Sequence, residues 1–110
     1  MKDAMAKLGI EASIRAYDSG TMSKIVFAHD FDTLPYSEGF ASEDPDVVFG
    51  DFYVTGALRN YGEWSDPKVE KLYAEQSQTM DPLKRNQLVQ DMERAAMDGV
   101  PRVTLYWAAQ

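Results

Sequence analysis

Apolar side chains recur every three or four residues through the second half of the chain, which is the spacing of helices with one buried face. One run follows Ser65-Asp66-Pro67 and the next follows Asp81-Pro82, and both starts join a capping aspartate to a first-turn proline. We therefore expect two helices, the second of which ends at Gly99. The positions predicted to share one face are Val69, Leu72, Tyr73 and Gln76 in the first helix, and Arg85, Leu88, Val89, Met92, Ala95 and Ala96 in the second.

Other stretches alternate apolar and polar side chains, as a half-buried strand does. Residues 10–17 read IEASIRAY and alternate cleanly, so we expect a strand there. Residues 31–36 (FDTLPY) and 102–107 (RVTLYW) are predicted to form two further strands. Because Pro35 has no N–H to donate, pairing of the second strand should stop there or lie at a sheet edge.

Two short helices are expected before the long connection in the middle of the chain. The first covers residues 2–8 and ends with Gly9 in the C′ position. It is barely two turns long and has no capping residue ahead of it, so we interpret it as the end of a longer helix. The second follows Asp18, Ser19 or Thr21, any of which can cap it. Its helically spaced positions are Met22, Ile25, Val26 and His29.

The predicted elements come in the order helix, strand, helix, strand, long connection, helix, helix, strand. This alternation favours an α/β fold in which helices pack on a small mixed sheet. At 110 residues the chain fits one domain of ordinary size, and we expect residues 1–110 to form it.

Composition and charge narrow the classes of function. The formal net charge of -7 argues against nucleic acid and anionic membranes as partners, because both favour basic patches. Cysteine is absent, which excludes disulfides, thiolate nucleophiles and cysteine-based zinc sites. The sequence has no apolar run long enough for a transmembrane helix, and its first ten residues lack the apolar segment of a signal peptide.

Residues 41–67 form a long connection that is rich in aromatic, glycine and acidic residues. Long connections of this kind often carry binding function. Aromatic side chains supply contact area and a polar edge, so they suit both ligand pockets and packing. The residues open to either role are Tyr36, Phe40 and Tyr61, and the predicted core residues are Phe49, Phe52 and Trp64.

The polar residues near this connection do not form a recognisable catalytic or metal site. The acidic residues lack the spacing of a calcium-binding loop, and Asp44 is expected to cap a short helix that starts at Pro45. His29 is the only histidine, and we expect it at a helix C-terminus, where its cation complements the helix dipole. No phosphate-binding glycine loop or hydrolase motif occurs, so we predict no cofactor.

Three segments, taken in order, carry a resemblance to a known family. They are residues 4–24 (AMAKLGIEASIRAYDSGTMSK), residues 29–49 (HDFDTLPYSEGFASEDPDVVF) and residues 59–107, which begin RNYGEWSDPKVEKL. Together they resemble the family 5 extracellular solute-binding proteins, the peptide-, dipeptide- and nickel-type receptors of ABC importers. The resemblance covers nearly all 110 residues, and it lies in the order of the motifs more than in any one of them.

The resemblance implies that the chain is a fragment of the C-terminal lobe of a type II periplasmic binding protein, whose two lobes enclose a ligand. It implies a non-enzymatic, periplasmic receptor that captures peptides or similar small solutes and delivers them to the permease subunits of an ABC importer. A signal peptide would then lie upstream. Surface that the rest of the protein normally covers would be exposed in the fragment, which favours self-association.

The resemblance also implies which residues contact the ligand. In the family the loop after the second predicted strand faces the cleft, and here that loop is residues 36–46. Dipeptide-type members hold the ligand's amino group with an aspartate whose place is taken here by Ala41, a departure that leaves Glu38 or Glu43 as the candidate carboxylate. The predicted ligand-binding residues are Tyr36, Ser37, Glu38, Gly39, Phe40, Glu43, Asn60 and Tyr61, whereas Asp44, Pro45 and Asp46 are expected to shape the loop.

Two other functions are open from the sequence. The first is a stand-alone acidic interaction domain that docks a basic protein partner, as the net charge allows. The second is an enzyme that uses Asp44 or Glu43 as a base, which requires a loss of turnover when either is replaced. The sequence offers this enzyme no nucleophile, metal set or cofactor loop.

Overall fold

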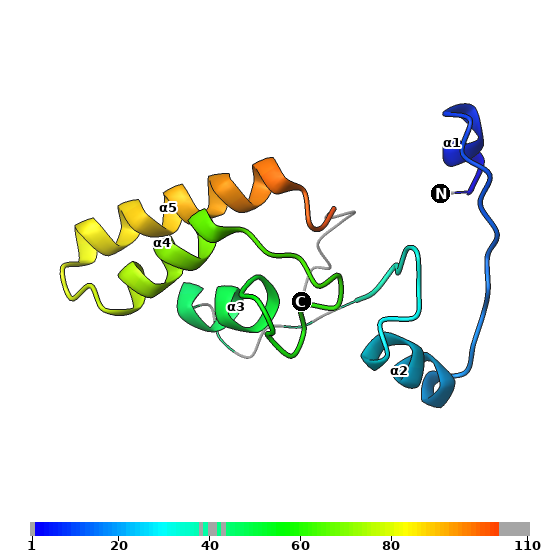
Figure 1. Ribbon diagram of the computed structural model, residues 1–110, viewed down its shortest axis with the longest axis horizontal. Helices are drawn as coiled ribbons and strands as arrows, with labels where there is room; N and C mark the ends of the chain where they lie inside the picture. Colours follow the sequence, from blue (N-terminus) through cyan, green and yellow to red (C-terminus); the bar gives the residue numbers. More distant parts are fainter. Residues whose placement is uncertain (1, 38, 40–41, 43, 104–110) are drawn as a thin grey trace. The chain divides into compact units, whose positions relative to one another are not determined.

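The structure is a computed structural model, which describes residues 2–37, 39, 42 and 44–103 (Figure 1). Its described elements are helices, and they fall into two compact units, Met1–Thr33 and Leu34–Gln110. The first unit contains α1 (Lys2–Lys7) and α2 (Ser19–Phe27). The second contains α3 (Pro45–Phe52), α4 (Pro67–Ser77) and α5 (Pro82–Gly99).

The predicted α/β fold with a small mixed sheet is wrong, because no strand occurs among the described residues. Residues 10–17 run as an extended trace between α1 and α2 (Figure 1), with Ile10 49% and Ile14 78% exposed. Residues 31–36 are not a strand either, and of the third predicted strand only Arg102 and Val103 are described, outside any strand. Alternation indicates which face a strand would bury, but a strand forms only where a second segment pairs with its N–H and C=O groups.

The ends of the helices in the first unit follow the sequence closely. The N–H of Ile10 donates to the carbonyl of Met5 at 3.0 Å, and that of Gly9 donates to Ala6 at 3.1 Å. With Gly9 at φ 77°, this is the Schellman arrangement predicted for a C′ glycine. At the start of α2 the Asp18 carboxylate accepts from two backbone N–H groups, so the capping prediction is confirmed.

His29 closes α2 in the same way. Its φ of 54° places it in the left-handed region, and the N–H groups of His29 and Asp30 donate to the carbonyls of Val26 and Ile25. Histidine is among the few side chains that adopt this region with some frequency. The prediction that His29 lies at a helix C-terminus is confirmed, and the structure adds that it occupies the turning position.

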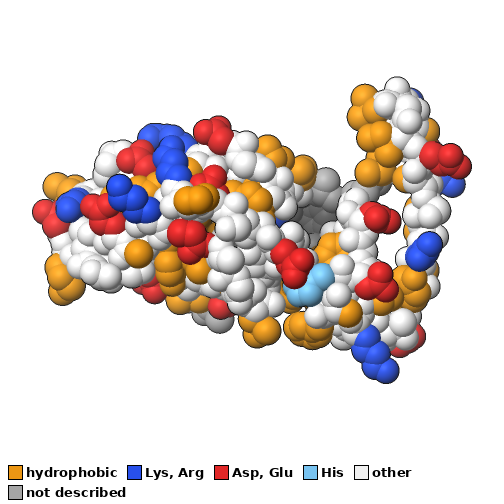
Figure 2. Space-filling view, viewed as in Figure 1, with side chains coloured by type: hydrophobic (Ala, Val, Ile, Leu, Met, Phe, Trp, Pro, Cys, Tyr) orange, Lys and Arg blue, Asp and Glu red, His pale blue; other side chains and the backbone are white. Residues whose placement is uncertain are grey.

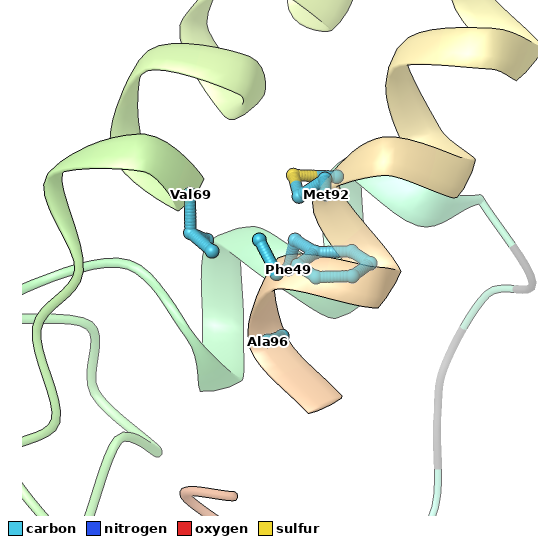
Figure 3. Close-up of a cluster of buried hydrophobic side chains, with 5 residues drawn as sticks. Phe49, Val69, Met92 and Ala96 are labelled. Carbon is cyan, nitrogen blue, oxygen red and sulfur yellow. The ribbon is translucent and has the colours of Figure 1, made fainter. Parts of the chain in front are cut away.

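The core of the second unit lies where α3, α4 and α5 meet. The helices α4 and α5 form a hairpin, and α3 packs against α4 (Figure 1). In Figure 3 Phe49 from α3, Val69 from α4, and Met92 and Ala96 from α5 converge on one another. This cluster confirms Phe49 as a core residue. Figure 2 shows acidic and basic side chains interspersed over the visible face of α4 and α5.

The helical spacing correctly predicts the inner faces of α4 and α5. Val69 and Gln76 on α4 are fully buried, with Leu72 and Tyr73 packed against the core beside them. On α5 the buried positions are Leu88, Met92, Ala95 and Ala96. The first turns of α3, α4 and α5 are capped by Asp44, Asp66 and Asp81, and each cap is followed by a proline, as predicted.

The end of α5 shows a second use of glycine. Gly99 is the last helical residue, but the left-handed residue is Val100, at φ 46°. A Cβ on Gly99 would lie 2.8 Å from Cζ2 of Trp64. Gly99 therefore lets the indole of Trp64 pack against the helix end, and this packing against the core confirms the predicted role of Trp64.

Candidate ligand-binding site

The segment between α3 and α4 is irregular, and Asn60 organises it. Asn60 is 5% exposed, and its Nδ2 donates to the carbonyls of Val54 at 3.2 Å and Trp64 at 2.7 Å. Its Oδ1 accepts from the N–H of Trp64 at 3.1 Å. The N–H and the carbonyl of Trp64 are thereby satisfied by one side chain, and the carbonyl of Val54, which also accepts from the N–H of Ala57 at 3.1 Å, gains a second hydrogen bond. Asn60 holds the loop that carries its two neighbours, Arg59 and Tyr61.

A second polar clamp ties the same loop to α4. The Glu70 carboxylate accepts from the N–H of Thr55 at 2.6 Å and from its hydroxyl at 2.7 Å. The Thr55 hydroxyl also lies 2.9 Å from Oγ of Ser65. Glu70 projects from the first turn of α4, which is anchored in the core by its neighbour Val69. The loop therefore has a defined shape although it contains no regular structure.

A small pocket, which we call the Tyr36–Tyr61 pocket, opens beside this loop. It is lined by Tyr36, Ser37, Gly39, Arg59 and Tyr61 and has a volume of about 170 Å³. The rings of Tyr36 and Tyr61 meet edge to face, with centroids 5.8 Å apart and planes inclined by 79°. Nη1 of Arg59 donates a long hydrogen bond of 3.4 Å to the carbonyl of Gly39.

Two guanidinium groups lie near the ring of Phe52. That of Arg59 is 5.4 Å from the ring centroid and that of Arg102 is 4.6 Å from it. Nη2 of Arg102 also donates to the backbone carbonyl of Arg59 at 2.6 Å. Phe52 is 2% exposed, so it is a core residue as predicted, and its ring supports both cations. Arg102 fixes the backbone from which Arg59 reaches the pocket.

The acidic residues at the start of α3 have structural partners. Asp44 forms a 2.6 Å ion pair with Nη2 of Arg85 on α5. The N–H of Asp46 and then the Arg85 guanidinium hold the pKa of Asp44 below its usual value. Nε2 of the fully buried Gln76 donates to Asp46 at 2.6 Å, while its Oε1 accepts from Arg85 at 3.1 Å.

This network extends to Ser77 and Tyr73. The Ser77 hydroxyl hydrogen-bonds to the Asp46 carboxylate. Burial first, and the nearby Asp46 charge second, raise the pKa of Tyr73. A Cβ on Gly50 would lie 2.6 Å from the Tyr73 hydroxyl, so the glycine permits the close approach of α3 to α4. The polar groups therefore hold α3 against α4 and α5, which agrees with a role of Asp44 and Asp46 in shaping the loop.

A larger hollow lies at the turn between α4 and α5, with a volume of about 460 Å³. Two of its polar lining residues, Ser77 and Arg85, are already bonded to Asp46 and Asp44. None of the predicted ligand-binding residues that the structure describes lines it. Its remaining lining residues are Pro45, Thr79, Met80, Pro82, Asn86 and Val89. We therefore take the Tyr36–Tyr61 pocket as the candidate site.

The structure brings together four of the eight predicted ligand-binding residues, namely Tyr36, Ser37, Gly39 and Tyr61. Asn60 lies beside them but is buried, and its amide groups are used within the loop. Glu38, Phe40 and Glu43, like Ala41, lie outside the described residues.

Sequence reasoning missed Arg59 and Arg102. The net charge of -7 drew attention to the acidic residues, and a single arginine beside a tyrosine has no periodic signal. The available signal was the position of Arg59 immediately before Asn60 and Tyr61, both of which were predicted to bind ligand.

Within the described part of the chain, no three His, Asp or Glu side chains are grouped so that they could hold a metal ion. The described helices include none that is both long enough and apolar enough to span a membrane.

Comparison with known proteins gives a distant relation. No protein-family model and no solved structure matches the chain. The chain is 27% identical over 103 residues to a protein of Pseudomonas aeruginosa (strain UCBPP-PA14) named "Di/tripeptide-binding protein 1". The match covers 92% of this chain but only 19% of the relative's length. The chain is thus similar to one part of a peptide-binding protein, to which it is distantly related.

Proposed function

We propose that the chain is part of the C-terminal lobe of a peptide receptor that serves an ABC importer in the periplasm. It contributes one wall of a cleft in which a short peptide is held between two lobes, and permease subunits then receive the peptide. The receptor itself is not an enzyme. The observation that carries the proposal is the similarity of 92% of the chain to a named di/tripeptide-binding protein.

The geometry of the loop supports this proposal. The Tyr36–Tyr61 pocket gathers residues from two segments of the chain, and the Asn60 and Glu70 clamps fix the second segment. A fixed pocket with aromatic edges and a few polar groups is typical of sites that recognise small ligands.

Exposed apolar side chains agree with a piece that other parts of a larger protein cover. Leu8 and Ile14 are each 78% exposed, and Leu58 is 74% exposed. Figure 2 shows apolar side chains at the surface of both units. Surfaces of this kind are expected to promote self-association when the chain is studied by itself.

The experiment is calorimetric titration of the full-length protein that contains this chain. The panel comprises dipeptides, tripeptides, a pentapeptide and single amino acids, with a basic protein as a further titrant. Saturable binding of short peptides at micromolar concentration or below supports the receptor. Failure to bind any peptide, together with binding of the basic protein, would instead support the acidic interaction domain.

A further inference from the structure

We infer that Arg59 binds the terminal carboxylate of the peptide in the Tyr36–Tyr61 pocket, an inference that rests on the proposed function. Of the described residues that line this pocket, Arg59 carries the charge, and the others offer hydroxyl groups, aromatic rings and backbone. A guanidinium presents five N–H donors in a planar fork that matches a carboxylate. In the proposed complex this fork holds the carboxylate at the C-terminal end of the peptide.

The donors of Arg59 are little used within the described residues. Apart from any contact with residues that the structure does not describe, the side chain makes one hydrogen bond, to the Gly39 carbonyl, and its length of 3.4 Å marks a weak contact. The ion pairs among the described residues involve Lys84, Arg85 and Arg94, but not Arg59. The guanidinium carbon of Arg59 also lies 5.4 Å from the centroid of the Phe52 ring, which is a cation–π contact and not a hydrogen bond.

Arg102 fixes the backbone of Arg59 beside the pocket. Its guanidinium lies 4.6 Å from the same Phe52 ring, so two positive charges share one small region of a chain whose net charge is -7. Arg102 also bonds to the backbone carbonyl of Arg59, so it acts as a positioning residue.

The volume of the pocket suits one end of a peptide better than a whole peptide. Its volume of about 170 Å³ is below the roughly 300–1,000 Å³ of pockets that hold a whole drug-sized ligand. A carboxylate with its adjoining Cα fits this volume, and the edges of Tyr36 and Tyr61 can contact the last side chain. The rest of the peptide would extend out of the pocket.

The test compares two forms of one neutral tripeptide, with a free and with an amidated C-terminus, on the full-length protein. The variants are Arg59→Gln and, as a matched control, Arg94→Gln, which removes an exposed arginine paired with Asp91 on α5. For the natural protein we expect amidation to weaken binding roughly tenfold to a hundredfold, the range of a charge-assisted hydrogen bond. In Arg59→Gln the free and amidated peptides should bind alike, whereas the control retains the full difference.

The other outcomes are distinguishable. If Arg59 only covers Phe52, Arg59→Gln weakens both peptides by the same factor and the amidation effect persists, which overturns the inference and leaves the receptor standing. A third peptide, amidated and carrying an internal glutamate, serves as a further probe. If Arg59→Gln weakens the binding of this peptide alone, Arg59 binds a side-chain carboxylate, and the assignment to the terminal carboxylate is overturned. If neither peptide binds the natural protein, the proposed function fails, and the inference fails with it.

Discussion

Replacement of Asn60 by alanine is the sharpest test of how the candidate site is built. Asn60 is 5% exposed and holds the N–H of Trp64 and the carbonyls of Val54 and Trp64, at 3.1, 3.2 and 2.7 Å. Alanine removes all three hydrogen bonds. It leaves the N–H and the carbonyl of Trp64 to find water or remain unsatisfied, whereas the carbonyl of Val54 keeps its hydrogen bond from the N–H of Ala57. Arg59 and Tyr61 flank this position, so the pocket should loosen together with the loop.

The expected magnitude follows from the number of bonds. Each such bond contributes about 1 kcal/mol net, so their loss should lower the free energy of unfolding by about 3 kcal/mol. A unit that spans residues 34–110 has a total stability of about 4–12 kcal/mol on typical per-residue values. The variant should therefore remain partly or fully folded at room temperature but be clearly weakened.

Urea unfolding followed by far-ultraviolet circular dichroism measures this effect, because the described structure is helical. With a urea dependence near 1–3 kcal/mol per molar, the midpoint should fall by roughly 1–3 M. The control is Asn86→Ala, an exposed position on α5, which should shift the free energy by less than about 0.5 kcal/mol. Equal stability of the two variants would refute the claim that Asn60 organises the loop.

Two further predictions concern packing and pH. Gly99→Ala places a Cβ 2.8 Å from a ring carbon of Trp64, so it should lower the free energy of unfolding by about 1–2 kcal/mol, as measured in thermal melts. The control Gly62→Ala, whose Cβ meets no atom within 4 Å, should be close to neutral. Equal melting temperatures of the two variants would contradict the packing of Trp64 against the helix end. Folding lowers the pKa of Asp44 from its ordinary value of 3.8, so the ionised carboxylate stabilises the folded state. This contribution to the free energy of unfolding is fully present above pH 3.8 and is lost as the pH falls through the lower pKa of the folded state. In Arg85→Gln the hydrogen bond from the N–H of Asp46 still lowers the pKa of Asp44, but the guanidinium no longer does. The urea midpoint of this variant should therefore fall less steeply between about pH 5 and about pH 2 than that of the natural protein. An identical dependence of the urea midpoint on pH in both proteins would argue against the ion pair.

The sequence predicted the helices because the interactions that define them are local. Capping by Asp18, Asp44, Asp66 and Asp81 acts within three residues, and the 3.6-residue period of buried positions is visible in a short window. The glycine end of α1 is equally local, since Gly9 bonds back to Ala6. Such features need no knowledge of the rest of the fold.

The strands predicted at residues 10–17 and 31–36 were wrong because pairing is not local. The alternation in residues 10–17 is real, yet among the described residues no second strand supplies the hydrogen bonds that a ladder requires. The pattern describes the side chains a strand would need, and the exposed Ile14 shows that this face is not buried in the structure.

The candidate site was predicted in part for the same reason. Tyr36 and Tyr61 were recognisable as aromatic residues in and beside a long connection, and the structure places their rings 5.8 Å apart. Arg59 was missed because its importance depends on contacts with Gly39 and Arg102, which are 20 and 43 positions away in the sequence. The pairing of Asp44 with Arg85 likewise joins residues far apart along the chain.

The central claim is that this chain forms a wall of a peptide-binding cleft, and photochemical crosslinking tests it most directly. The full-length protein would be illuminated with a short peptide that carries a photoreactive side chain, digested, and mapped by mass spectrometry. We predict labelling within residues 36–61 that an excess of unlabelled peptide suppresses. Suppressible labelling confined to other parts of the protein would contradict the account.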